Sequence, residues 1–437
     1  MREAGRIAAA IEVLDTVLNR HQPVKDALRD WGKANRYAGS GDRAWISGLV
    51  LDAMRKRASH GVRMGEDTPR AMVLATLAHE WEMGQDAVAA IFDGDEHAPA
   101  PLTDAERAGM TAALPDDAPL WARAEIPDWL EASFVRGFGG DAEVEGAGMA
   151  ARAPVDLRVN ALKTDAEKAI SAVRAQINCD PSDLITSAIR IAAADPRAKA
   201  PPADSIPAYG KGWVEVQDLG SQIAALAAAP LDGLQALDFC AGAGGKTLAL
   251  AALMNNSGQL YAWDYDWRRL RAIWPRLERA GVRNVQVRTG KEGEALCDLE
   301  DRMDLVFIDA PCTGSGTWRR RPDTKWRLKE RALATRIKQQ DEVLAKAAKY
   351  VKAGGRMVYV TCSVLPEENG DRVNAFLAAN TSFRAVPVMD ALVRSGQLTE
   401  EGALILSACA GEHGALQLTP ARTGTDGFYV CVMEREG

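Results

Sequence analysis

Short apolar strands alternate with amphipathic helices through the second half of the chain, and this pattern restricts the possible folds more than any other feature. A β-α-β alternation produces a parallel sheet with helices on both faces. A strand at 213–217 leads into a helix at 219–229. The elements expected after it are strands 235–239, 259–263, 285–288, 304–308 and 356–360, and helices 245–254, 266–280, 331–351 and 366–379. We therefore predict an α/β fold with a doubly wound, Rossmann-like sheet in a catalytic domain over residues 213–437.

The first 212 residues have a different character. Apolar side chains recur at helical spacing in residues 1–93, and strand signals are nearly absent there. We predict an all-helical domain over residues 1–145, with a linker at the glycine- and acid-rich segment 137–148. A strand at 157–160, a helix at 164–177 and a strand at 188–193 then predict a small α/β subdomain over residues 150–212.

A glycine-rich turn follows the strand at 235–239 and reads Asp-Phe-Cys-Ala-Gly-Ala-Gly-Gly-Lys-Thr at residues 238–247. At a helix N-terminus such a turn presents backbone N–H groups to polar or anionic ligand groups. A P-loop would need glycine where Cys240 stands, and a dinucleotide fingerprint would need glycine where Thr247 stands. In the third interpretation, S-adenosylmethionine binds, and Asp264 at the next strand end accepts hydrogen bonds from its ribose. The loop alone leaves the cofactor undecided, and Asp264 could instead cap the following helix.

Two cysteines directly follow predicted strands: Cys312 in Asp-Ala-Pro-Cys at residues 309–312, and Cys362 in Thr-Cys-Ser at residues 361–363. Ligands of open α/β sheets bind at the strand ends. A reactive thiolate needs a polar or electropositive pocket, to which Lys246 could contribute. The seven cysteines are scattered, and none forms a Cys-x-x-Cys pair. We therefore predict neither a disulfide framework nor a metal site.

These groups suit methylation of cytosine at carbon 5. That carbon is a poor nucleophile until a thiolate adds to carbon 6 and makes it enamine-like. An acid near ring nitrogen 3, such as Asp309, would assist the addition. A base must then remove the carbon 5 proton, and a second thiol nearby is a reasonable participant. Viewed alone, Cys312 is the better candidate nucleophile because of its Pro-Cys setting.

Nearly the whole chain resembles the RNA cytosine-5 methyltransferases of the RsmB and Nop/Sun type. The helical first domain resembles, less closely, the NusB-like RNA-binding domain of bacterial RsmB-type proteins. The motifs that carry the resemblance are Leu-Arg-Val-Asn at 157–160, segment 216–222, the glycine turn, Asp264, segment 309–312, Arg-Pro-Asp at 321–323, segment 361–369 and Asp-Gly-Phe-Tyr at 426–429.

The resemblance implies that Cys362 is the nucleophile and that Cys312 assists breakdown of the covalent intermediate. Asp309 and Lys246 would contact the target cytosine, and Asp264 the cofactor ribose. The residues expected to bind S-adenosylmethionine are Cys240, Ala241, Gly242, Gly244, Gly245, Lys246, Asp264, Arg269 and Asp309.

The chain departs from the family at the end of the third strand. The family often carries an acidic residue there, near the adenine, but residues 289–292 read Thr-Gly-Lys-Glu. Either Glu292 takes this role in a shifted register, or the contacts to adenine are weaker.

Charge is distributed unevenly around a net charge of −7. Residues 80–145 hold 16 acidic and 3 basic side chains, whereas residues 318–338 hold 9 basic and 2 acidic ones together with Trp318 and Trp326. Basic side chains with aromatic neighbours can neutralise phosphates and stack on bases. We expect the 318–338 loop and the basic edge of the first domain to face RNA, with the acidic side turned away.

The predicted protein is a cytoplasmic, monomeric enzyme that methylates RNA, with ribosomal RNA as the expected substrate. Neither an apolar stretch of about 18 residues nor a signal-peptide layout is present, so no membrane partner is expected. One alternative is a non-catalytic RNA-binding factor of ribosome assembly, motivated by Lys291 and the acidic first domain. A DNA cytosine-5 methyltransferase is another, because its nucleophile motif also contains Pro-Cys.

Overall fold

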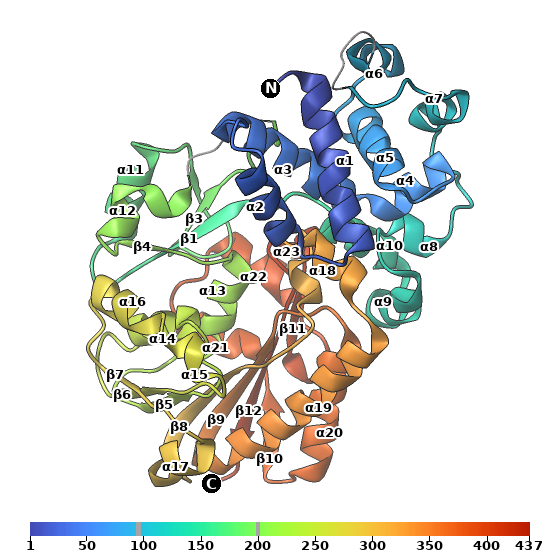
Figure 1. Cartoon of the computed structure of the whole chain (residues 1–437). Coiled ribbons are helices and arrows are strands. Elements are labelled where there is room, and N and C mark those ends of the chain that lie inside the picture. Colours follow the sequence, from blue (N-terminus) through green and yellow to red (C-terminus); the bar gives the residue numbers. More distant parts are fainter. Residues whose placement is uncertain (93–97, 198–201) are drawn as a thin grey trace. The chain divides into compact units, whose positions relative to one another are not determined.

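The computed structural model describes residues 1–92, 98–197 and 202–437 of the chain, which divides into two compact units (Figure 1). The helical unit comprises Met1–Arg152, Ala194–Pro201 and Trp318–Leu328. The sheet unit comprises Ala153–Ala193, Pro202–Thr317 and Lys329–Gly437. In the described part of the chain, no helix combines the length and apolar character needed to cross a membrane.

Short and medium-length helices build the helical unit. Side-chain caps define several of their starts: Thr68 accepts a hydrogen bond from the backbone of Ala71, and Thr103 forms a capping box with Glu106. Their apolar faces meet in one core that includes Ile7, Leu14, Ile46, Leu49 and Leu74. The helices are α1 (Glu3–Asn19), α2 (Val24–Ala34), α3 (Ser40–Arg55), α4 (Arg57–Met64), α5 (Pro69–Ala75), α6 (Gln85–Phe92), α7 (Asp104–Thr111), α8 (Leu120–Arg123), α9 (Glu131–Phe138), α10 (Ala142–Met149) and α18 (Pro322–Arg327).

The predicted linker at residues 137–148 is wrong, because this segment is mostly helical. Gly139, with φ +56°, ends α9, and α10 follows after a single 3-10 turn. A Cβ atom on Gly146 would overlap the carbonyl oxygen of Ala124. Glycine at this position therefore permits close helix packing and does not indicate a flexible connection.

The predicted RNA-facing loop at 318–338 is also corrected by the structure. Its first half belongs to the helical unit, and its second half forms the start of helix α19 (Glu330–Ala347). Trp318 is 1% exposed and stacks on Phe134, with ring centroids 6.1 Å apart. The indole N–H of Trp326 donates to the carbonyl of Met54 at 2.6 Å. Trp318 is thus unavailable for stacking on bases, and Trp326 is held within the protein.

Lys325 from the same basic segment is fully buried. Its ammonium group donates to the carbonyl of Arg55 at 3.2 Å, and burial lowers its pKa to about 7. Arg319 is also buried. A positive count in the sequence therefore overstates the charge that this segment can present to phosphates.

The sheet unit begins with a small antiparallel sheet in the order β2-β3-β1-β4. The predicted strand at 213–217 pairs with β1 in this small sheet and not with the large one. Buried Arg158 on β1 donates to the side-chain oxygen of Gln217 at 2.7 Å. This hydrogen bond connects the small sheet to the segment that directly follows β4. The elements are β1 (Val155–Val159), β2 (Asp180–Pro181), β3 (Ala188–Ile191), β4 (Val214–Val216), α11 (Ala166–Arg174) and α12 (Pro207–Gly210).

The large sheet has the order β10-β12-β9-β8-β5-β6-β7, and β11 pairs with β12. The five strands from β7 to β9 are parallel, while β12 and β10 are antiparallel to their neighbours. This topology is a doubly wound, Rossmann-like sheet, as predicted. The strands are β5 (Gln235–Asp238), β6 (Gln259–Ala262), β7 (Val285–Val287), β8 (Met303–Asp309), β9 (Val351–Thr361), β10 (Phe383–Val386), β11 (Leu416–Leu418) and β12 (Phe428–Arg435).

Strand order reverses between β5 and β8. From β5 the chain adds β6 and β7 on one side, and it then returns to add β8 and β9 on the other. Ligands of open α/β sheets bind outside the carboxyl ends of the strands at such a switch point. The glycine turn after β5 and the Asp309–Cys312 segment after β8 both leave the sheet there.

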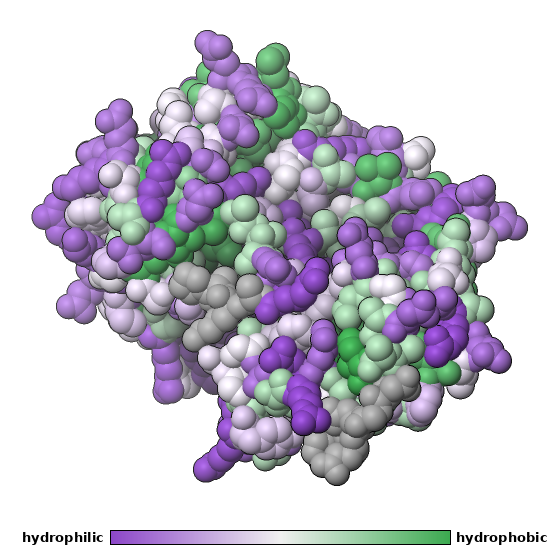
Figure 2. Space-filling view, turned by 90° about the horizontal axis from the view of Figure 1, so that it is seen from above, coloured by the Kyte–Doolittle hydropathy of each residue, from purple (hydrophilic) through white to green (hydrophobic). Residues whose placement is uncertain are grey.

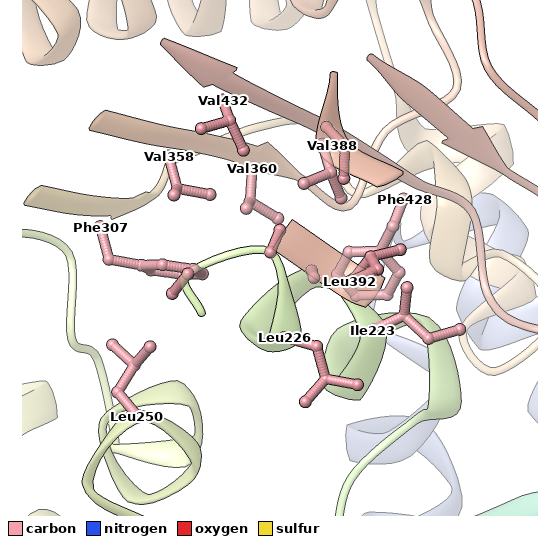
Figure 3. Packing of buried hydrophobic residues seen from close by; sticks show 14 of the residues in the cluster. Ile223, Leu226, Leu250, Phe307, Val358, Val360, Val388, Leu392, Phe428 and Val432 are labelled. Carbon is pink, nitrogen blue, oxygen red and sulfur yellow. The ribbon is translucent and has the colours of Figure 1, made fainter. Parts of the chain in front are cut away.

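Helices on both faces bury the sheet. On one side Ile223, Leu226 and Leu250 pack against strand residues that include Phe307 and Val360 (Figure 3). One face of the molecule is covered mainly by hydrophilic residues, with small hydrophobic patches between them (Figure 2). The remaining helices are α13 (Leu219–Leu226), α14 (Gly245–Leu253), α15 (Trp267–Leu270), α16 (Ile273–Ala280), α17 (Glu292–Ala295), α20 (Gly370–Ala379), α21 (Val388–Arg394), α22 (Glu400–Ser407) and α23 (Pro420–Thr423).

The helix predicted at 266–280 is divided into α15 and α16. Pro275 lacks an N–H group, and in a continuous helix its ring would clash with the carbonyl of Arg271. As the third residue of α16, Pro275 occupies the first turn, where the missing donor costs no hydrogen bond.

Candidate active site

The glycine turn is shaped by two residues with left-handed backbone. Gly242 has φ +54° and Gly244 has φ +85°, a conformation that side chains disfavour. A Cβ atom on Gly244 would overlap the Ile273 side chain, and one on Gly242 would lie 2.8 Å from the Arg269 guanidinium. The turn therefore needs glycine for both its backbone and its space, and α14 starts directly after it at Gly245.

Asp264 holds the glycine turn against the end of β6. Its Oδ2 accepts the backbone N–H of Gly242 at 2.8 Å and lies 3.2 Å from Arg269, while its Oδ1 accepts the N–H of Asp266. The side chain that caps α15 is Asp266 and not Asp264. A carboxylate has about four lone-pair positions, so Asp264 retains capacity to accept hydroxyl groups.

Asp238 lies buried beneath the turn and is not one of the predicted site residues. One of its oxygens accepts the hydroxyl of Thr247 at 2.7 Å, and the other has no hydrogen-bond partner in the described part of the chain. Burial raises the pKa of Asp238 to about 7. A buried acceptor without a partner beside a glycine cradle fits a site that a polar ligand completes.

Lys246 and Asp309 form an ion pair across the switch point. The Lys246 ammonium, in the first turn of α14, lies 2.8 Å from Oδ2 of Asp309 and 5.2 Å from the ring centroid of Phe428. Burial lowers the pKa of Lys246, but the attraction of Asp309 outweighs this effect and leaves the pKa raised. Lys246 is therefore a fixed positive charge at neutral pH.

The two cysteines that follow β8 and β9 meet in space, with 3.3 Å between the sulfur atoms of Cys312 and Cys362. The hydrogen bond with Cys362, followed by burial, raises the pKa of the Cys312 thiol well above its ordinary value. Cys312 thus stays protonated and can donate to the sulfur of Cys362.

A buried carboxylate connects the two cysteine loops. Glu368 accepts the N–H and hydroxyl of Thr313 at 2.8 and 2.6 Å, the hydroxyl of Ser363 at 2.5 Å and the amide of Gln340 at 3.0 Å. Thr313 follows Cys312 and Ser363 follows Cys362, so one side chain fixes both loops. The Pro-Glu-Glu-Asn motif at 366–369 contained this residue, but its role depends on partners distant in the chain.

Replacing Glu368 by glutamine should lower the free energy of unfolding by about 2 to 4 kcal/mol, because an amide N–H₂ group would face buried donors. Urea unfolding measures this change. Glu342→Gln, at an exposed position of α19, is the matched control and should leave stability unchanged. Equal stability of the two variants would contradict a connecting role for Glu368.

Glu292, the proposed substitute for the family's adenine-side acid, is held by other groups. Its carboxylate accepts the hydroxyl of Tyr350 at 3.1 Å and lies 3.4 Å from the ammonium of Lys346. The Trp263 indole, by contrast, donates to the carbonyl of Gly290 at 3.1 Å. This arrangement favours the second possibility raised by the sequence, in which contacts to an adenine are weaker.

The predicted site residues thus gather at the strand ends of one sheet. Cys362, Cys312, Asp309 and Lys246 form the candidate catalytic group, and Asp264 and Arg269 bind the turn that contains Cys240, Ala241, Gly242, Gly244 and Gly245. Burial raises the pKa of the Cys240 thiol well above its ordinary value, so Cys240 acts as a neutral lining residue. Within the described residues, no group of three or more His, Cys, Asp or Glu side chains is arranged to hold a metal ion.

The fold and the site define the class as a methyltransferase with a Rossmann-like sheet and a pair of cysteines at its switch point. The family described as 16S rRNA methyltransferase RsmB/F matches residues 225–434. The chain is 30% identical over 326 residues to ribosomal RNA small subunit methyltransferase B of Citrobacter koseri, a match that covers 74% of this chain and 70% of that protein. The chain belongs to the RsmB/F methyltransferase family, which confirms the resemblance seen in the motifs.

Other relatives match over a smaller part. The protein of the same name from Photorhabdus laumondii is 31% identical over 278 residues, which is 63% of this chain and 58% of that protein. The chain thus spans less than two thirds of the length of some curated relatives. Among solved structures, the crystal structure of PH0851 is similar in fold, with a TM-score of 0.73 at 24% identity, and the match covers 100% of this chain and 99% of that one.

Proposed function

We propose that this chain methylates carbon 5 of cytosine in ribosomal RNA, with S-adenosylmethionine as the methyl donor. The observation that carries the proposal is the pair of sulfur atoms 3.3 Å apart, at the same sheet edge as the ion pair of buried Lys246 with partly exposed Asp309. Relatives named ribosomal RNA small subunit methyltransferase B support the proposal. The proposal locates the reaction in the cytoplasm, where the thiols remain reduced.

The residues around the glycine turn fit the proposed cofactor. The turn offers backbone N–H groups at the start of α14 for polar groups of the ligand. Asp264 has lone pairs left for ribose hydroxyls, and Asp238 has a buried oxygen without a described partner. When bound, S-adenosylmethionine supplies the methyl group that carbon 5 accepts.

Cys362 is the attacking group, and the nucleophilic form of a cysteine is its thiolate. Its sulfur lies 3.3 Å from the thiol of Cys312. The Cys362 sulfur adds to carbon 6 of the cytosine, and ring nitrogen 3 takes a proton from water. The Asp309 carboxylate, held by Lys246, stabilises the protonated ring. The addition makes carbon 5 electron-rich enough to take the methyl group.

Cys312 then enables release. Its pKa is raised first of all by the hydrogen bond with Cys362, and this effect disappears once the Cys362 sulfur is bonded to carbon 6. Cys312 then gives its proton to water, and its thiolate is the base that removes the carbon 5 proton. Elimination expels the Cys362 thiolate and frees the methylated RNA.

The direct test is transfer of labelled methyl groups from S-adenosylmethionine to ribosomal RNA, with DNA of matched sequence as the competing substrate. Digestion of the product to nucleosides identifies the methylated atom. 5-Methylcytidine in RNA supports the proposal. Transfer to DNA alone would support the DNA methyltransferase alternative, and RNA binding without any transfer would support the assembly-factor alternative.

Replacing Asp264 by asparagine should weaken S-adenosylmethionine binding about tenfold or more, because hydrogen bonds to a charged acceptor contribute about 1.5 to 3 kcal/mol. Titration calorimetry measures the dissociation constant. Asp266→Asn is the matched control, since asparagine caps a helix as well as aspartate does and α15 should remain intact. Equal affinities for both variants would remove Asp264 from the cofactor site.

A further inference from the structure

Three large aromatic side chains are exposed on the segment that follows Asp264. Tyr265 is 88% exposed, Trp267 49% and Trp274 56%. Tryptophan is usually highly buried, and its exposure leaves a large apolar surface in water. The two tryptophans lie on α15 and α16, which follow the same sheet edge as the glycine turn.

Arginines accompany these rings. Six arginines and three carboxylates lie between residues 264 and 283, in a chain whose net charge is −7. The guanidinium of Arg271 lies 4.3 Å from the ring centroid of Trp267. Arg271 and Trp274 are both exposed, so the segment presents cations and aromatic faces together.

The same pairing continues onto the small sheet of this unit. The ammonium groups of Lys168 and Lys211 each lie 4.7 Å from the ring centroid of Trp213. A Cβ atom on Gly212 would overlap the carbonyl oxygen of Arg279, so the chain that enters β4 touches the backbone of α16 there. Helices α11, α12 and α16 lie on one side of the sheet unit (Figure 1).

We infer that this surface, the aromatic–basic strip formed by Trp213, Lys168, Lys211, Trp274, Arg271 and Trp267, binds a single-stranded segment of the RNA substrate. Lysine and arginine neutralise phosphates, and every base can stack on an exposed indole. A duplex hides its bases, so alternating rings and cations suit a single strand better. The inference rests on the proposed function only in taking RNA as the ligand.

The strip also explains how a chain with net negative charge can hold RNA on its sheet unit. The basic segment that the sequence favoured has Trp318, Arg319 and Lys325 buried in the helical unit. The strip instead begins at Trp267, shortly after Asp264 in the chain, and continues onto α16, which packs against the glycine turn. There Arg276 of α16 donates to the carbonyl of Ala243 at 2.6 Å.

The test uses the full chain and a fluorescent, unstructured single-stranded RNA of roughly 15 nucleotides, followed by fluorescence anisotropy. The double variant Trp267→Ala/Trp274→Ala should raise the dissociation constant for RNA at least about tenfold. Arg271→Gln should reduce the slope of log Kd against log salt by about 0.7. Leu404→Ala, a 76% exposed side chain on α22 of the same unit, is the matched control and should bind RNA as the wild type does.

S-Adenosylmethionine affinity and thermal stability should remain unchanged in the double variant, which separates a binding role from a folding defect. An RNA affinity within twofold of the wild type would overturn the inference. Loss of self-association in sedimentation with unchanged RNA affinity would also overturn it, because the strip would then contact a second copy of the chain. If RNA binding depends on the strip but the protein transfers no methyl group, the proposed function is contradicted. The inference that the strip binds RNA is then still supported.

Discussion

Replacing Cys362 by alanine should abolish methyl transfer to RNA, with a rate at least about 10⁴-fold below the wild type. Without the sulfur that adds to carbon 6, carbon 5 of the cytosine is never made electron-rich enough to accept the methyl group. Incorporation of labelled methyl groups into ribosomal RNA under single-turnover conditions measures the rate. S-Adenosylmethionine affinity should be retained, since the glycine turn and Asp264 are untouched.

Cys297→Ala is the matched control for this change. Cys297 is an exposed cysteine on the 3-10 turn Cys297–Leu299, and its loss should leave the rate unaltered. Comparable rates for Cys362→Ala and the wild type would refute the proposed covalent mechanism. Loss of activity in Cys297→Ala as well would point instead to a general sensitivity of the fold to cysteine loss.

Replacing Cys312 by alanine should have a different result, the accumulation of a covalent complex between protein and RNA. Attack by Cys362 remains possible, but the base that removes the carbon 5 proton is missing, so release is blocked. A band of reduced mobility on a denaturing gel, sensitive to nuclease and to protease, reports the complex. Turnover should fall to a single methyl transfer per protein.

The double variant Cys312→Ala/Cys362→Ala provides the control, because it lacks the attacking sulfur and should form no complex. A Cys312→Ala variant that turns over like the wild type without a trapped complex would remove Cys312 from the release step. A complex that persists in the double variant would show that another residue of the chain forms the bond to RNA.

The large sheet and the glycine turn were accessible from sequence because their signals are local. Apolar runs separated by helical periods define a parallel sheet, and the turn at 238–247 follows such a run directly. The positions of Cys312 and Cys362 at strand ends also follow from this alternation, since parallel strands end at one edge. Asp238 belongs to the same turn, but the sequence does not reveal its importance. Only the structure shows that one of its oxygens is buried without a described hydrogen-bond partner.

Two predictions were wrong because the same residue types occur both in exposed loops and in close internal packing. Glycine and acid at 137–148 indicated a flexible linker, whereas Gly146 is small because α10 lies against Ala124. Basic and aromatic residues at 318–338 indicated an RNA-facing loop, whereas Trp318 stacks on Phe134 inside the helical unit. Both outcomes depend on partners more than 20 residues away, which periodicity cannot identify.

The sequence alone determined the parallel strands from β5 to β9, the glycine turn after β5 and the two cysteines at strand ends, because each depends on neighbours along the chain. Tertiary structure alone decided that Cys312 and Cys362 lie 3.3 Å apart, that Glu368 binds the loops of both, and that exposed tryptophans line α15 and α16. The physical reason is that hydrogen bonding and burial depend on distance in space. A residue such as Glu368 gains its role from Thr313, which lies 55 positions away in the chain.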